Sequence, residues 1–121
     1  MAKKDLLKER IVYKPFEYQE AADYWLKQHQ AHWLHTEVPM MSDITDWSSN
    51  LNKTEKNIIG SILKGFAQTE TVVNDYWSGL VTKWFRKPEV IMMATTFGAF
   101  ETIHAEAYSL LNETLGLENF D

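Results

Sequence analysis

The feature that most constrains this chain is a long helical pattern of apolar residues with one acidic residue in its middle. The residues of this stripe follow one another by three or four positions: Ile59, Leu63, Phe66, Glu70, Val73 and Trp77. The pattern predicts a helix over residues 53–81, about 29 residues and roughly 43 Å long at 1.5 Å per residue. Burial of an unpaired Glu70 would cost several kcal/mol, so we expect it to meet a cation, take up a proton or face water.

A second pattern carries three more polar groups on one helical face. Pro88 begins this helix, expected over residues 88–115, and Gly116 ends it. Its inward face is expected to hold Ile91, Ala94, Phe97, Glu101, His104, Tyr108 and Leu111. Glu101, His104 and Tyr108 share that face because they are three, four and seven positions apart. A glutamate and a histidine one turn apart form the Glu-x-x-His pair that di-metal carboxylate bundles use.

The N-terminal third is less regular. Residues 1–15 are expected to form an extended arm with an excess of basic side chains: Lys3, Lys4, Lys8, Arg10 and Lys14. We interpret the arm as a solvated tail, with contact to an acidic partner as the alternative. A first helix is predicted over 16–34, with an inward face of Tyr18, Ala21, Ala22, Trp25, Leu26, His29 and Trp33.

Residues 35–51 contain turn-forming residues and space for one short helical turn near 44–47. Asn52 with Glu55 three positions later has the spacing of a capping box at the start of the second long helix. No segment has a convincing strand pattern. The expected fold class is therefore all-α.

Composition narrows the function classes. The 121 residues carry a formal charge of −5, which argues against a nucleic-acid surface. Without cysteine there can be no disulfides, thiolate metal sites or cysteine nucleophiles. No apolar run has the length of a signal peptide or a membrane span, so we expect a soluble cytoplasmic chain without a membrane partner.

Each polar residue on the two faces has an ordinary explanation when taken alone. A single buried histidine is usually a core residue with satisfied hydrogen bonds, and a single glutamate is usually solvated. Two carboxylates that face each other, however, need a cation or a shared proton between them. Iron or manganese accepts this mixture of carboxylate and imidazole ligands. The coincidence of Glu70 with Glu101 and His104 therefore favours a metal site.

The number of ligands is also informative. A di-metal bundle takes one glutamate from each of two helices and one Glu-x-x-His pair from each of two more. This sequence supplies Glu70 and the pair Glu101–His104, which is half of such a site. The other half is expected from a second polypeptide, either another copy of this chain or a different one.

Several segments together resemble a known family. They are Val12-Tyr-Lys-Pro-Phe16, Trp33-Leu-His-Thr-Glu37-Val-Pro39, Phe66-Ala-Gln-Thr-Glu70 and Phe100-Glu-Thr-Ile-His-Ala-Glu-Ala-Tyr108. With these residues the chain resembles the N-terminal part of the radical-generating small subunit of class I ribonucleotide reductases. The resemblance implies the N-terminal half of a ferritin-like bundle, over residues 16–121, that another chain completes.

Residue roles follow from the resemblance. It implies that Glu70 is a terminal ligand of one metal, Glu101 bridges two metals and His104 binds the first. Iron is the expected metal, with manganese or a mixed pair as alternatives, because Glu70 stands where many members have aspartate.

The resemblance also assigns a function. It implies that the metal centre, after reaction with oxygen, oxidises Tyr108 to a radical, and that Trp33 lies on the radical route to the large catalytic subunit. The implied partners are a complementary C-terminal small-subunit fragment, the large subunit and a second copy of the assembled small subunit. Together they would reduce ribonucleotides to deoxyribonucleotides.

Two other classes remain open from the residues themselves. Two copies of this chain would also supply a complete ligand set, as in a homodimeric ferritin-like metal-binding or ferroxidase protein. A helical interaction protein with solvated acids is the third possibility.

Overall fold

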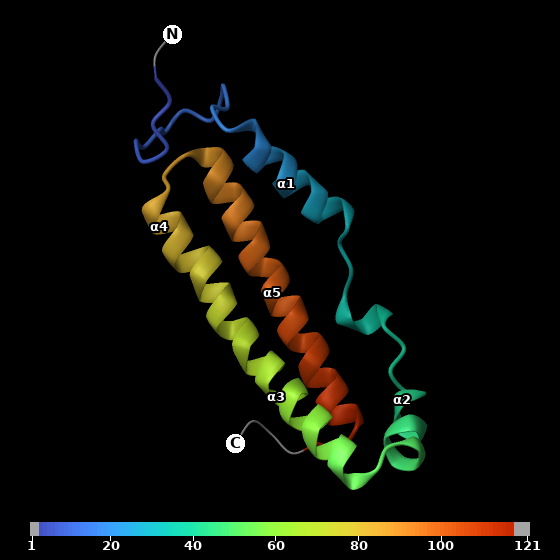
Figure 1. The fold of residues 1–121 in the computed structure, drawn as a ribbon. Helices are drawn as coiled ribbons and strands as arrows, with labels where there is room; N and C mark the ends of the chain where they lie inside the picture. The colour runs from blue at the N-terminus through green and yellow to red at the C-terminus, as the bar shows by residue number, and fades with distance from the viewer. Residues whose placement is uncertain (1–2, 118–121) are drawn as a thin grey trace. The chain divides into compact units, whose positions relative to one another are not determined.

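The computed structural model describes residues 3–117 and is helical throughout its regular parts. The elements are α1 (Gln19–Gln30), a 3₁₀ turn (His35–Glu37), α2 (Asp43–Thr45), a π-helical turn (Asp46–Asn50), α3 (Lys53–Asp75), a second π-helical segment (Tyr76–Val81), α4 (Thr82–Trp84) and α5 (Pro88–Thr114) (Figure 1). Residues 118–121, the end of the expected helical segment, lie outside this range. Within it there is no strand, which confirms the all-α class.

The described residues fall into two compact units. Residues 3–32 with Val73–Glu101 form the first unit, and Trp33–Val72 with residues 102–117 form the second. In the first unit, the end of α3 and α4 run antiparallel to the first part of α5 (Figure 1). In the second unit, the first part of α3 runs antiparallel to the last part of α5. No helix in the described part of the chain is both long and apolar enough to cross a membrane.

The two long helices have the ends that their sequences predict. At the start of α3, the Glu55 amide donates to Asn52 Oδ1 (2.9 Å) and the Asn52 amide donates to Glu55 Oε1 (3.3 Å), which confirms the capping box. At the end of α5, Gly116 has a φ of 74°. The amides of Gly116 and Leu117 donate to the carbonyls of Glu113 and Asn112 in a Schellman motif. The predicted range 88–115 is therefore close to the observed helix.

The first helix is shorter than the predicted range 16–34. It begins at Gln19 because the amides of Glu17 and Tyr18 donate to the Glu89 side chain, at 2.7 and 3.0 Å, which fixes the residues before the helix. It ends at Gln30, and the chain is extended at Leu34, whose amide donates to the Glu37 carboxylate (2.8 Å). Part of its predicted inward face is also wrong, because Leu26 is 47% exposed and Trp33 lies outside the helix.

The core of the first unit forms around small residues. Ala21, Val81, Val90 and Ala94 are buried, and Trp77, Phe85 and Met93 pack against them. The second long helix does not stop at residue 81 as predicted, because α4 extends it to Trp84 through the π-helical segment. In this segment Ser78 lies so close to Gly98 of α5 that a Cβ atom at position 98 would overlap its side chain.

The solvated-tail interpretation of the arm is wrong at Arg10. The Arg10 guanidinium pairs with Glu17 (3.0 Å) and with Glu89, whose side chain is fully buried. Burial alone would raise the pKa of Glu89, but the hydrogen bonds from Arg10 and from backbone amides outweigh it and lower the pKa to about 2. The sequence analysis did not identify this pair.

The close approach at Gly98 predicts a difference between two glycines. Gly98→Ala should reduce the free energy of unfolding by about 1–3 kcal/mol, because the new methyl group collides with Ser78. Gly65→Ala, where a Cβ meets no atom within 4 Å, should raise it by up to about 1 kcal/mol through helix propensity. Chemical denaturation followed by circular dichroism measures both. Equal effects of the two substitutions would contradict the packing at Gly98.

The Glu89 pKa predicts acid sensitivity. A carboxylate with a lowered folded-state pKa stabilises the fold fully above its ordinary pKa near 4.5 and loses that effect as the pH falls towards 2. The wild-type free energy of unfolding should therefore drop by about 3 kcal/mol over this window. Glu89→Gln should lack that drop and be less stable at neutral pH, whereas the exposed control Glu20→Gln should retain it. Denaturation curves from pH 6 to 2.5 distinguish the two.

Candidate metal centre

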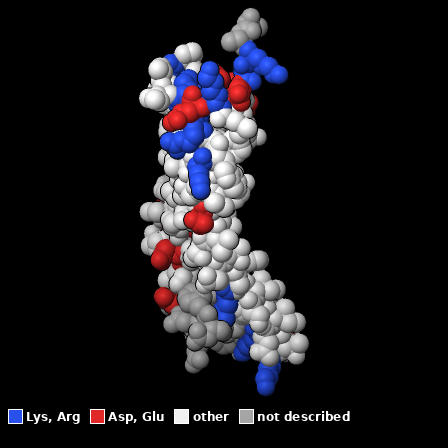
Figure 2. All heavy atoms as spheres, turned by 90° about the vertical axis from the view of Figure 1, so that its left-hand side faces the viewer, with Lys and Arg blue, Asp and Glu red and all other residues white. Residues whose placement is uncertain are grey.

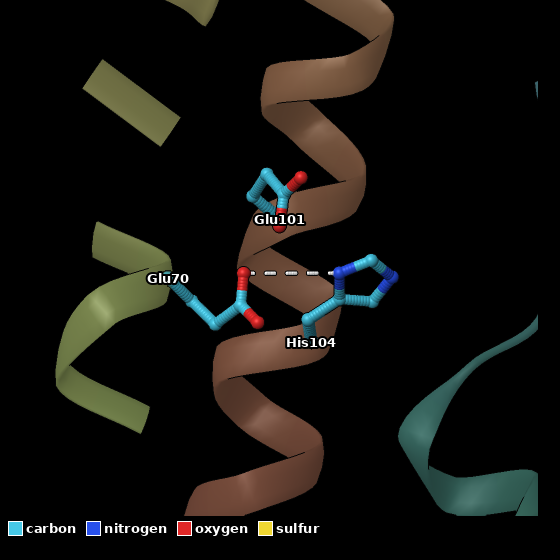
Figure 3. Close-up of side chains that lie close together, drawn as sticks. All are labelled: Glu70, Glu101 and His104. Atoms are coloured by element: carbon cyan, nitrogen blue, oxygen red, sulfur yellow. Dashed lines mark ion pairs between the residues drawn. The ribbon is translucent and has the colours of Figure 1, made fainter. Parts of the chain in front are cut away.

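Two helices bring the predicted ligands together. Glu70 lies on α3, and Glu101 and His104 lie one turn apart on α5. Glu70 Oε2 is 3.8 Å from His104 Nδ1 within the second unit, and Figure 3 shows the Glu70 carboxylate directed at the Nδ1 edge of the His104 ring. Glu101 is the last residue of the first unit, but α5 passes through this boundary without a break. Its position relative to His104 is therefore set by helix geometry.

The distances are suited to one metal ion. One ligand atom from each of Glu70, Glu101 and His104 can be chosen so that all three lie within 4.8 Å of one another. Ligand atoms around one divalent ion are at most about 4.4 Å apart, since each lies roughly 2.0–2.2 Å from it. Side-chain movements would therefore be needed to close the group around one ion. Two carboxylates and one imidazole are donors that iron and manganese accept.

The group is only partly enclosed by the described residues. The Glu70 side chain is 16% exposed and the His104 side chain 39% exposed. Glu101 is also half-buried. Ligands from further residues could therefore approach the group, as a site with only three ligands from this chain requires.

Trp33 packs on the proposed histidine ligand. Its ring is stacked on that of His104, with centroids 5.9 Å apart and planes 21° apart. Trp33 itself is 37% exposed. Because α1 ends before it, Trp33 reaches His104 from an extended segment and not from the inward face of a helix, as the sequence had suggested. The contact joins one predicted radical-transfer residue directly to one predicted ligand.

Tyr108 lies one turn beyond His104 and packs against Phe66, with ring centroids 5.3 Å apart. Phe66 was identified as a member of the apolar stripe and of a segment that resembles the family, and its contact with Tyr108 was not anticipated. The signal was present, because Phe66 is four residues before Glu70 and Tyr108 is four residues after His104. In an antiparallel helix pair such positions lie opposite each other.

The fold and the ligand group define the class first. Helices that present one lone glutamate and one Glu-x-x-His pair to each other are the framework of di-metal carboxylate proteins. The sequence matches the family "Ribonucleotide reductase, small chain" over residues 10–121. The chain therefore belongs to the ribonucleotide reductase small chain family, whose fold is a ferritin-like helical bundle.

Individual relatives support the same assignment. A probable ribonucleoside-diphosphate reductase small subunit of Invertebrate iridescent virus 6 is 40% identical over 112 residues, which cover 93% of this chain and 31% of the relative. The small subunit of Dictyostelium discoideum is 31% identical, covering 88% of this chain and 32% of the relative. Small chain 1 of Saccharomyces cerevisiae is 30% identical, covering 88% and 27%. The chain thus spans roughly a third of the length of these relatives.

The geometry predicts metal binding by this chain itself. Mn²⁺ should bind with an affinity that falls at least about tenfold in Glu70→Gln, because even outer partners of metal ligands contribute 10–100-fold. Glu106→Gln is the matched control, since Glu106 lies on the same helix but is exposed and outside the ligand group. The electron paramagnetic resonance signal of free Mn²⁺ measures binding. Equal affinities of the two variants would exclude Glu70 as a ligand.

Proposed function

We propose that this chain forms the N-terminal half of the radical-generating centre of a class I ribonucleotide reductase small subunit. The observation that carries the proposal is the convergence of Glu70, Glu101 and His104, with Tyr108 one turn away on the same helix. Membership of the small chain family supports it. The assembled enzyme would reduce ribonucleotides to deoxyribonucleotides in the cytoplasm.

The proposed roles of the three ligands follow their positions. Glu70 would be a terminal ligand and His104 a ligand of the same metal, because their side chains already face each other. Glu101, one turn before His104 on the same helix, would bridge to the second metal. When bound, a pair of iron or manganese ions would react with oxygen and supply the oxidising equivalent for a nearby tyrosine.

Tyr108 would be that tyrosine. It would give one electron and the proton of its phenol oxygen to that oxidised centre, leaving a neutral radical. The Phe66 ring packed against it would hold the Tyr108 ring in place and help to keep water and reductants from it. A buried apolar surrounding prolongs the life of such a species because quenching requires contact with a reductant.

Trp33 would carry the oxidising equivalent onward. Its stacked contact with His104 joins the ligand group to a ring that is 37% exposed. When a large catalytic subunit docks, an electron could pass from Trp33 to the metal centre, so that the oxidising equivalent moves outward to Trp33. The large subunit would bind the substrate, and the assembled small subunit would be a dimer.

The remaining ligands would come from residues beyond these 121. The chain provides one lone glutamate and one Glu-x-x-His pair, and a di-metal bundle needs two of each. A complementary C-terminal portion of a small subunit would supply them and cover the exposed side of His104. Two copies of this chain could also satisfy the number of ligands, but membership of the reductase small chain family favours the first arrangement.

A radical measurement tests this function. The chain, assembled with the small-subunit residues that complete its ligand set, should give a tyrosyl radical signal in electron paramagnetic resonance after addition of iron and oxygen. Tyr108→Phe should abolish the signal, since phenylalanine has no phenol to oxidise. Tyr76→Phe, a control at an exposed tyrosine on another helix, should leave it unchanged. An unchanged signal in Tyr108→Phe would remove Tyr108 from the mechanism.

A further inference from the structure

A hollow beside the N-terminal arm, within the first unit, has no role in the proposed radical chemistry. Its volume is about 450 Å³, which lies within the range of small-molecule sites. The basic and aromatic residues that line it are Lys3, Lys4, Lys8, Arg10, Phe16 and Lys87. Figure 2 shows charged side chains gathered at the end of this unit that carries the arm.

The arm is held in place by contacts that its sequence does not suggest. Arg10 donates from its guanidinium to the carbonyls of Val12 (2.7 Å) and Tyr13 (3.1 Å), and pairs with Glu17 and Glu89. The Arg10 amide also donates to the carbonyl of Arg86. Because Arg10 uses all these partners, the segment around it is fixed against α5. The hollow is therefore lined by a docked segment of the chain.

A turn then orients the lysines nearer the N-terminus. The Lys8 amide donates to the Asp5 carbonyl (3.2 Å), and the Leu7 amide donates to Asp5 Oδ1 (3.0 Å). These two hydrogen bonds to Asp5 hold the segment between Lys4 and Lys8 in one conformation. Their side chains line the same hollow.

Of the three acidic residues that line the hollow, Glu17 and Glu9 are in ion pairs, and Asp5 accepts from the Leu7 amide. Glu17 accepts from both Arg10 and Lys87, the latter at 2.9 Å, and the Lys87 side chain is only 3% exposed. Glu9 lies 4.0 Å from Arg86. The inner basic groups are thus neutralised within the protein.

The outer lysines differ from the inner ones. Within residues 3–117, Lys3, Lys4 and Lys8 form no ion pair, and Lys4 lies over the Tyr18 ring at 5.8 Å. These three ammonium groups share the hollow with one carboxylate outside the ion pairs, Asp5, so positive charge is in excess there although the chain has a formal charge of −5. Their mutual repulsion would be relieved by an anion with several charges.

We propose that this hollow binds a polyphosphate group, with Lys3, Lys4 and Lys8 as its ligands. A group with several negative charges matches three separated ammonium groups better than a single carboxylate does, and lysine commonly binds phosphate as a point charge. Phe16 provides an apolar wall beside the lysines, against which a base could pack if the polyphosphate belongs to a nucleotide. The site is independent of the proposed radical function, because it shares no residue with the metal group.

Calorimetric titration of the 121-residue chain with inorganic tripolyphosphate tests the site. Saturable one-to-one binding is expected, and the triple variant Lys3→Gln, Lys4→Gln, Lys8→Gln should weaken it at least tenfold. The matched control is Lys27→Gln, Lys53→Gln, Lys83→Gln, which removes the same charge from exposed lysines elsewhere and should change the affinity less than twofold. The affinity should also fall as salt is raised from 0.05 to 0.3 M.

Two comparisons identify the ligand. A nucleoside triphosphate that binds more tightly than tripolyphosphate, with the difference removed by Phe16→Ala, would identify a nucleotide as the source. Equal binding of the two would identify the phosphate chain alone, and either result supports the site. Equal losses in the two triple variants, absence of saturation, or equally tight binding of an oligoglutamate peptide would overturn it. Circular dichroism of each variant verifies that its fold is intact.

Discussion

The organisation of the first unit depends on one buried carboxylate. Glu89 lies at the start of α5, accepts hydrogen bonds from the amides that precede α1, and pairs with Arg10 of the N-terminal arm. A buried charge without such partners would be strongly destabilising, so the three segments are coupled through it. The same contacts fix where α1 begins and give the arm the defined path that lines the hollow with Lys3, Lys4 and Lys8.

The metal group is subject to the same requirement, that a carboxylate removed from water needs a partner of opposite charge. Glu70 interrupts an apolar stripe on α3, and its carboxylate meets His104 and Glu101 of α5. Two carboxylates held near each other need positive charge, which a divalent cation supplies better than an exposed imidazole. The residues that pack around the group are aromatic: Trp33 on His104 and Phe66 on Tyr108. They can hold the His104 and Tyr108 side chains in place without competing as metal ligands.

Local signals predicted the long helices well. The Asn52–Glu55 capping box and the glycine stop at Gly116 act within a few residues, so their outcome hardly depends on the rest of the fold. The first helix was predicted too long because its ends are set by carboxylates elsewhere. Glu89 fixes its start, and Glu37 draws the Leu34 amide away from helical bonding. Helical periodicity contains no information about either competitor.

The amino-acid sequence was sufficient for the helical class, the ligand types and the family, because periodicity, spacing and motif are properties of neighbouring residues. Tertiary structure alone decided that Glu70 faces His104, that Trp33 stacks on the same imidazole from outside any helix, and that Arg10 meets Glu89. The last contact joins residues 79 positions apart. Such pairs form only when separate segments pack against each other. Burial makes an unpaired charge costly, but which residue becomes its partner depends on the tertiary fold.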